Sequence, residues 1–125
     1  MTVIPGALAR RTETPNAVMT TLASPTQGGA GHAVWRVEMR PGQAGPEHAF
    51  DREQVWVALA GAATVELDGE PAGVAPGDAV VMPAGVIRRV SADPQAGFTA
   101  MVTAPAGARA FLPDGTDRGV PAWIA

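Results

Sequence analysis

The sequence contains no cysteine and no lysine. The absence of cysteine excludes disulfide scaffolds, thiolate zinc sites and cysteine nucleophiles, although it leaves the redox compartment open. All nine basic residues are arginine, so the chain also lacks the lysine that a Schiff base or a phosphate-binding P-loop requires. These two absences remove several classes of active site at once.

Basic clusters and long apolar runs are equally scarce. The formal net charge is −3 and no run of four basic residues occurs, so the electrostatic footprint that nucleic acids require is missing. The longest apolar stretch, Val55 to Val65, is about half the length of a membrane span, and Gly61 interrupts it. We therefore expect neither a nucleic-acid partner nor a membrane partner. At the N-terminus the arginines follow the short apolar stretch, unlike in a secretory signal, so a cytoplasmic location is expected.

What the chain does contain is apolar material and turn residues. Its 125 residues are 46% hydrophobic and include 15 glycines and 12 prolines, which predicts one domain with a core and many turns between short elements. Residues 1–15 show no sustained period and are expected to form an arm or an edge strand. Residues 105–125, rich in proline, glycine and alanine, are expected to pack back on the domain as a tail.

The central part of the chain has the periodicity of β-strands. Trp35, Val37 and Met39 alternate with charged residues, which predicts a half-buried strand. Residues 54–60 are apolar on both faces, which predicts a central strand covered on each side. The dipeptide at 68–69, Asp-Gly, predicts a hairpin turn. Roughly seven short strands with turn signals every eight to twelve residues or so favour an all-β sandwich or barrel.

Two segments resemble the motifs of the cupin family. Residues 41–61, PGQAGPEHAFDREQVWVALAG, match the first motif, and residues 77–92, GDAVVMPAGVIRRVSA, match the second. The residues at motif positions are Gly42, His48, Phe50, Gln54, Gly61, Gly77, Pro83, Gly85 and Arg88. The resemblance covers about residues 33–104 and implies an antiparallel double-stranded β-helix, the jelly-roll barrel, as a single cupin domain over residues 1–125. It also implies a homodimer.

The motifs depart from the metal-binding pattern of the family. Cupins that bind a metal use three histidines and a carboxylate or amide, whereas only His48 and Gln54 stand at such positions here. Phe50 offers no lone pair, and the guanidinium of Arg88 is a permanent cation that repels a metal ion. The resemblance therefore implies a degenerate ligand set, and we expect no metal and no cofactor. The alternative is a metal-dependent dioxygenase or sugar isomerase, in which a carboxylate displaced by a β-bulge joins His48 and Gln54.

Strand alternation gives an independent reason to place Arg88 inside the barrel. Arg88 shares a face with Val86 and Val90, whereas Arg89 falls on the opposite face. A buried guanidinium is costly unless it is paired or hydrogen-bonded. Its partner is expected to be a carboxylate such as Glu47 or Glu53, unless it lies at the barrel mouth. In the functional interpretation, it binds the anionic group of a small ligand.

Other candidate residues allow two interpretations each. His48 suits a general acid or base, because the ordinary pKa of histidine is about 6.5, but it is equally interpreted as a neutral histidine hydrogen-bonded to Gln54. Trp56 is expected to face the interior, either as core filler or, beside Phe50, as an aromatic wall for a flat ligand. His32 is expected to be solvated at a loop end.

Together these residues predict a barrel that binds a small anionic or aromatic molecule without a metal. The predicted ligand-binding residues are His48, Phe50, Gln54, Trp56 and Arg88; Met82 and Met101 are expected in the core. Candidate reactions are isomerisation, cyclisation and lyase chemistry, with His48 as acid or base and Arg88 stabilising negative charge. A non-catalytic ligand sensor or a purely structural protein is the remaining alternative, and it predicts a closed interior.

Overall fold

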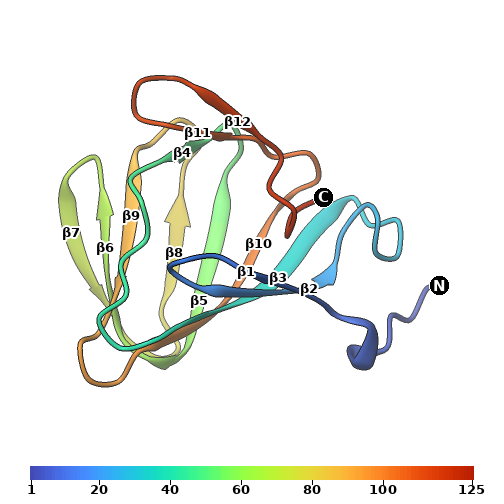
Figure 1. The fold of residues 1–125 in the computed structure, drawn as a ribbon, viewed down its shortest axis with the longest axis horizontal. Coiled ribbons are helices and arrows are strands. Elements are labelled where there is room, and N and C mark those ends of the chain that lie inside the picture. Colours follow the sequence, from blue (N-terminus) through green and yellow to red (C-terminus); the bar gives the residue numbers. More distant parts are fainter.

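The structure is a computed structural model that describes residues 1–125 and is built almost entirely of short strands (Figure 1). One 3₁₀ turn, η1 (Gly6–Leu8), precedes them. The strands are β1 (Arg10–Glu13), β2 (Val18–Ala23), β3 (His32–Met39), β4 (Ala49–Phe50), β5 (Gln54–Gly61), β6 (Ala63–Leu67), β7 (Glu70–Val74), β8 (Ala79–Met82), β9 (Arg88–Ala92), β10 (Phe98–Pro105), β11 (Ala110–Phe111) and β12 (Asp117–Gly119). None of these elements is a helix long and apolar enough to cross a membrane.

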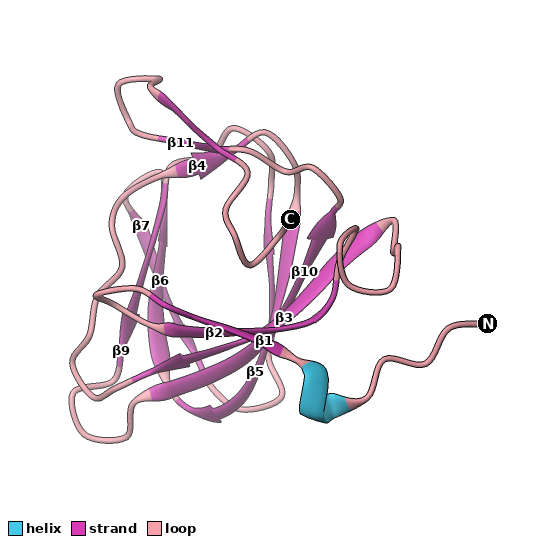
Figure 2. Ribbon diagram, turned by 45° about the vertical axis from the view of Figure 1, so that its right-hand side comes forward, coloured by secondary structure: helices cyan, strands magenta, loops and turns pink.

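The strands form three sheets that surround one interior. A six-stranded sheet has the order β1-β2-β3-β10-β5-β8, and two three-stranded sheets have the orders β12-β11-β4 and β7-β6-β9. Every strand pair is antiparallel, and the sheets face one another across the barrel (Figure 2). The predicted all-β jelly-roll barrel is therefore confirmed. There are more strands than the roughly seven predicted, in part because β4, β11 and β12 are only two or three residues long, too short to show a period; β2, six residues long, was not predicted either.

The core follows the alternation predicted for the central strands. Along β3, Trp35, Val37 and Met39 are buried, whereas Arg36 and Glu38 between them are exposed. The paired strand β10 is buried at every second residue, starting from Phe98. These side chains belong to one hydrophobic cluster of 19 buried residues. The inward faces of both strands thus form one wall of the interior.

Strand β5 is covered on one face only, so the prediction that both faces are covered was wrong. Gln54 and Ala58 are buried, but Val57 and Leu59 on the other face are 38% and 48% exposed. Strands β10 and β8 flank β5 within the same sheet, and no further layer lies over that side. Met101 was also expected in the core, yet it is only half-buried and stands beside Val57 in the strand register, on this same outer face.

Glycine is required where β5 ends. Gly61 has a φ angle of +71°, and a Cβ atom added there would lie 2.0 Å from the main-chain oxygen of Gly97. Both the backbone conformation and the close approach of the two chains exclude a side chain. At the predicted hairpin between β6 and β7, Asp68 and Gly69 have φ angles of 49° and 81°, as a tight two-residue turn demands.

The two ends of the chain meet at one side of the barrel. Strand β1 pairs with β2 at the edge of the six-stranded sheet. The chain before it extends away from the barrel (Figure 2), and Met1 and Val3 are exposed. The tail returns to the same region, where Ile124 is completely buried. Arg10 and Ser24 donate hydrogen bonds of 2.9 and 2.7 Å to the main-chain oxygen of Ala125. These contacts fasten the tail across the open end of the barrel.

Candidate functional site

The barrel encloses a cavity of about 660 Å³. This volume lies within the range of pockets that hold small organic ligands. Its walls come from the barrel strands, from the turn between β1 and β2, and from the tail, which contributes Phe111, Arg118 and Trp123. The tail is therefore part of the pocket wall.

One region of the cavity is polar and positively charged. Arg88, Arg118 and His48 are the only titratable side chains that line it, and no aspartate or glutamate does so. This is notable in a chain whose formal net charge is −3. The local charge balance favours an anionic guest over a cationic one.

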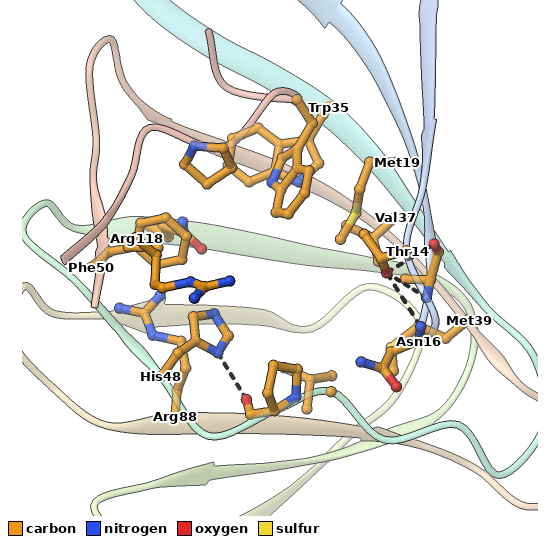
Figure 3. Close-up of a pocket in the computed structure, with 18 of the residues that line it drawn as sticks. Thr14, Asn16, Met19, Trp35, Val37, Met39, His48, Phe50, Arg88 and Arg118 are labelled. Atoms are coloured by element: carbon orange, nitrogen blue, oxygen red, sulfur yellow. Dashed lines mark hydrogen bonds between the residues drawn. The ribbon is translucent and has the colours of Figure 1, made fainter. Parts of the chain in front are cut away.

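The rest of the cavity is apolar and aromatic. Met19, Trp35 and Val37 lie on the side away from His48 and Arg88 (Figure 3). The three tryptophans of the chain, Trp35, Trp56 and Trp123, all line the cavity. An organic molecule with an apolar body and a polar end therefore matches the cavity better than a uniformly polar one.

His48 lies immediately before β4 and borders the polar region. Its Nδ1 atom is 2.8 Å from the main-chain oxygen of Pro46. Because a carbonyl oxygen only accepts hydrogen bonds, Nδ1 is the donor, and in the neutral ring Nε2 carries the free lone pair. Burial lowers the pKa of His48 from 6.5, the Pro46 hydrogen bond opposes this, and the charge of Arg88 adds to the lowering. The lowered pKa favours the neutral form of the ring.

The hydrogen bond between His48 and Gln54, one of the two interpretations of His48, is not formed. The Oε1 atom of Gln54 instead accepts a hydrogen bond of 3.0 Å from the indole nitrogen of Trp56. This contact fixes the orientation of the amide, because the indole N–H can only donate. Gln54 Nε2 is left buried without an acceptor. The polar region therefore contains a donor that the protein itself does not satisfy.

Backbone hydrogen bonds hold Arg88 beside His48. The amide of Arg88 donates to the oxygen of His48 at 2.8 Å, and the amide of His48 donates to the oxygen of Arg88 at 3.1 Å. These reciprocal bonds join the first residue of β9 to a segment forty positions earlier. The side chain of Arg88 is inside the barrel, as strand alternation predicted, with 1% of the residue exposed.

The guanidinium of Arg88 has no carboxylate partner. Its nearest polar contacts are the Sδ atom of Met82 at 3.6 Å and the main-chain oxygen of Pro83 at 3.5 Å, and its Nε atom has no partner. Its carbon Cζ lies 5.2 Å from the centre of the Phe50 ring, in the range of a cation–π contact. Burial lowers the pKa of Arg88 from the usual value of an arginine to about 10.

The predicted ion pair of Arg88 with Glu47 or Glu53 was therefore wrong. Glu47 is exposed and lies 4.0 Å from Arg89 instead, on the outer side of the strand. Arg88 and Arg89 are neighbours on β9, so their side chains point to opposite faces of the strand. Glu47, which lies beside Arg89 on the outer face, therefore cannot also pair with Arg88 inside the barrel. The charge inside the barrel is consequently unbalanced.

Phe50 and Trp56 do not lie side by side, so they do not form the single aromatic wall for a flat ligand that was one interpretation of Trp56. Phe50 packs edge-to-face against His48, with ring centres 5.3 Å apart. Trp56 lies inside, as predicted, but stacks on Phe98 at 6.5 Å. His32 is exposed, as expected, and Met82 is fully buried in the core.

Arg118 is the functional candidate that the sequence did not indicate. It lies on β12, in a tail without a clear period, seventy positions after His48. Only the return of the tail onto the barrel brings it to the cavity. The prediction that the tail packs back pointed to this region of the chain but to none of its side chains.

The residues present do not fit a metal ion. No group of three or more histidine, cysteine, aspartate or glutamate side chains comes together anywhere in the chain. At the family's ligand positions, His48 offers one nitrogen, the oxygen of Gln54 is engaged by Trp56, and Arg88 places a cation nearby. This donor set is too small and its charge has the wrong sign for a divalent ion.

Comparison with known proteins identifies the family. The family model described as the cupin domain matches residues 35–103, more than half of the chain. Among solved structures, the polyketide cyclase RemF from Streptomyces resistomycificus superposes with a TM-score of 0.74 at 19% identity, covering 98% of this chain and 88% of that one. The DMSP lyase DddQ from Ruegeria pomeroyi gives 0.73 at 23% identity, covering 87% and 63%.

KdgF from Halomonas has a TM-score of 0.69 at 20% identity, with 84% of this chain and 94% of that chain covered. No curated protein sequence matches. The likeness to the solved structures concerns the fold, whereas the family model and the two sequence motifs concern the sequence itself. On this evidence the chain belongs to the cupin family.

Proposed function

We propose that this cupin binds a small organic anion with an apolar or aromatic body inside its barrel, without a metal ion. The observation that carries the proposal is the composition of the cavity wall. Two arginines and a histidine line it without any carboxylate, beside a larger apolar surface. A buried, unpaired positive charge is costly, and an anionic ligand would supply the counter-charge that the protein lacks.

The same arrangement supports proton transfer as the chemistry. Neutral His48, with Nδ1 donating to Pro46, presents Nε2 as a base. It would take a proton from a carbon next to a carbonyl group, the electron pair would remain on the ligand as an enolate, and the arginines would stabilise that charge. Return of the proton to another atom gives isomerisation, attack of the enolate on a carbonyl gives cyclisation, and loss of a leaving group gives a lyase reaction.

Two of the similar structures are named for reactions of this kind. One is a polyketide cyclase that nearly the whole chain matches, and another is a DMSP lyase. At 19% and 23% identity their substrates are not transferable to this chain. The preference for cyclisation or elimination over a metal-dependent dioxygenase rests on the metal ligands that this chain lacks, because a salicylate 1,2-dioxygenase is equally similar in fold, with a TM-score of 0.72.

Phenylpyruvate, an aromatic keto acid with acidic benzylic hydrogens, tests binding and chemistry together. We expect it to raise the thermal midpoint of the protein, and we expect the protein to accelerate exchange of those hydrogens in D₂O, followed by NMR. The variant His48→Gln should lose the acceleration, whereas His32→Gln, which changes the only other histidine, should keep it.

The outcomes separate the remaining alternatives. Binding without accelerated exchange would reject catalysis on enolisable acids by His48 and favour the ligand-sensor interpretation. Absence of any binding by aromatic acids would reject the proposal as a whole. The third alternative, a ligand sensor or a purely structural protein, predicted a closed interior, and the cavity does not match that prediction.

The homodimer and the cytoplasmic location stay predictions. The outer face of β5 and β8 carries exposed Val57, Leu59 and Val81, an apolar surface that is compatible with association. Sedimentation velocity at micromolar concentration should give the mass of two chains; a single 12.7 kDa species would reject the homodimer.

A further inference from the structure

Arg118 differs from Arg88 in being accessible. It lies on β12 (Asp117–Gly119), is exposed, and lines the cavity. Its side chain extends toward the ring of His48 (Figure 3). Arg118 forms no ion pair; the carboxylate of the adjacent Asp117, which points to the opposite face of β12, lies 3.0 Å from Arg109. Arg118 is thus a free cation that faces the cavity.

Arg88 is poorly placed to make the same contact. Only 1% of the residue is exposed, and Phe50 lies against its guanidinium. Its Nε atom is completely enclosed. A ligand in the cavity would therefore reach at most the edge of this group, whereas the planar fork of Arg118 is open to bidentate contact with an anion.

We infer that Arg118, rather than Arg88, is the residue that contacts the anionic group of the ligand and selects anionic ligands. This inference rests on the proposed function of the cavity. It names the ligand class more closely as an amphipathic acid. Its carboxylate, sulfonate or phenolate lies against the guanidinium of Arg118, and its apolar body lies against Met19, Trp35 and Trp123.

Arg88 then acts as a positioning residue. Its backbone holds His48 in place through two reciprocal hydrogen bonds, and its charge favours the neutral form of that histidine. The two arginines would have separable effects. Replacement of Arg118 changes which ligands bind, whereas replacement of Arg88 removes the smallest of the three contributions to the pKa of His48 and leaves the anion contact intact.

Two dyes with the same rings provide the test. Anilinonaphthalenesulfonate carries one sulfonate, and N-phenylnaphthylamine is the same framework without it. We would titrate both, by fluorescence, into the wild type, Arg118→Gln, Arg118→Lys and Arg109→Gln. Arg109→Gln is the matched control, because this substitution removes one positive charge from the same β11–β12 hairpin, and Arg109 does not line the cavity. Leu59→Ser controls for dye bound to the exposed outer face.

We expect Arg118→Gln to weaken binding of the sulfonated dye about tenfold, the effect of losing one charge-assisted hydrogen bond. Binding of the neutral dye should change less than about twofold. Arg118→Lys should keep affinity for the anionic dye within about threefold, since the charge is retained. Arg109→Gln and Leu59→Ser should leave both dyes unaffected.

Three results would overturn the inference. If Arg118→Gln binds the sulfonated dye as tightly as the wild type does, Arg118 makes no contact with the anion, although the proposed function survives. If Arg109→Gln weakens binding of both dyes as strongly as Arg118→Gln does, the hairpin shapes the cavity, but Arg118 does not select ligands by their negative charge. If neither dye binds the wild type, the proposed function fails and this inference fails with it.

Discussion

Replacement of Arg88 by methionine should make the protein more stable. Methionine is similar in length, is apolar, and adapts to irregular spaces in a core. Arg88 is almost completely buried, with no carboxylate near it and an unpartnered Nε atom. Replacing a buried, poorly compensated charge by an apolar side chain of similar volume is commonly neutral or stabilising.

The size of the effect follows from the pKa of the group. Burial lowers the pKa of Arg88 from the usual value of an arginine to about 10, which corresponds to about 3 kcal/mol of destabilisation of the charged form at pH 7. The contact with Phe50 at 5.2 Å returns about 0.5–2 kcal/mol. The contacts with Met82 and Pro83 are long and contribute little. We therefore expect Arg88→Met to raise the free energy of unfolding by about 1–3 kcal/mol.

Urea denaturation at pH 7, followed by tryptophan fluorescence, measures this change. The neighbouring variant Arg89→Met is the matched control, because it removes the same charge from the outer face of β9, where the effect should stay within about 0.5 kcal/mol. A decrease of about 1 kcal/mol or more in Arg88→Met would refute the reasoning. It would mean that the guanidinium is a satisfied structural element rather than an uncompensated charge retained for function.

Three further predictions concern pH, backbone strain and metal content. The pKa of His48 is lowered in the fold from 6.5, so as the pH falls the unfolded state is protonated at this residue before the folded state is. The free energy of unfolding should therefore decrease as the pH drops below 6.5. In urea denaturation at several pH values, the plot of this free energy against pH should be flatter for His48→Gln and unchanged for His32→Gln. Gly61→Ala should lower the free energy of unfolding by at least about 2 kcal/mol, because the residue has a positive φ angle and its new Cβ atom would clash with Gly97. Gly69→Ala, where φ is +81° but the space is open, should lower it by about 1 kcal/mol. Equal losses of stability for the two variants in thermal melts would contradict this prediction. Protein purified without a chelator or an affinity tag should contain far less than one metal ion per chain by elemental analysis, and a stoichiometric metal would overturn the metal-free proposal.

The sequence predicted features that depend on local alternation. The inward position of Arg88 follows from its parity with Val90 along β9 (Arg88–Ala92), whereas Val86 lies before that strand. The same holds for the buried face of β3 and for the hairpin at Asp68 and Gly69, where the conformation is a property of the dipeptide itself.

Features that depend on distant segments could not be predicted. The outer face of β5 carries apolar residues, but whether another layer covers them depends on where the rest of the chain goes. Arg118 reaches the cavity only because the tail crosses the barrel end, where Arg10 and Ser24 fasten it. The hydrogen bond considered between His48 and Gln54 likewise could not be ruled out from the sequence. His48 donates instead to the carbonyl oxygen of Pro46, and Gln54 accepts instead from Trp56.

The most direct test of an anion-binding cavity is a crystal structure of the protein in complex with anilinonaphthalenesulfonate. We predict the sulfonate beside Arg118 and His48, with the rings against Trp35 and Trp123 inside the barrel. A dye molecule bound solely on the outer face near Leu59, with the barrel interior left to water or to a metal ion on His48, would contradict the account.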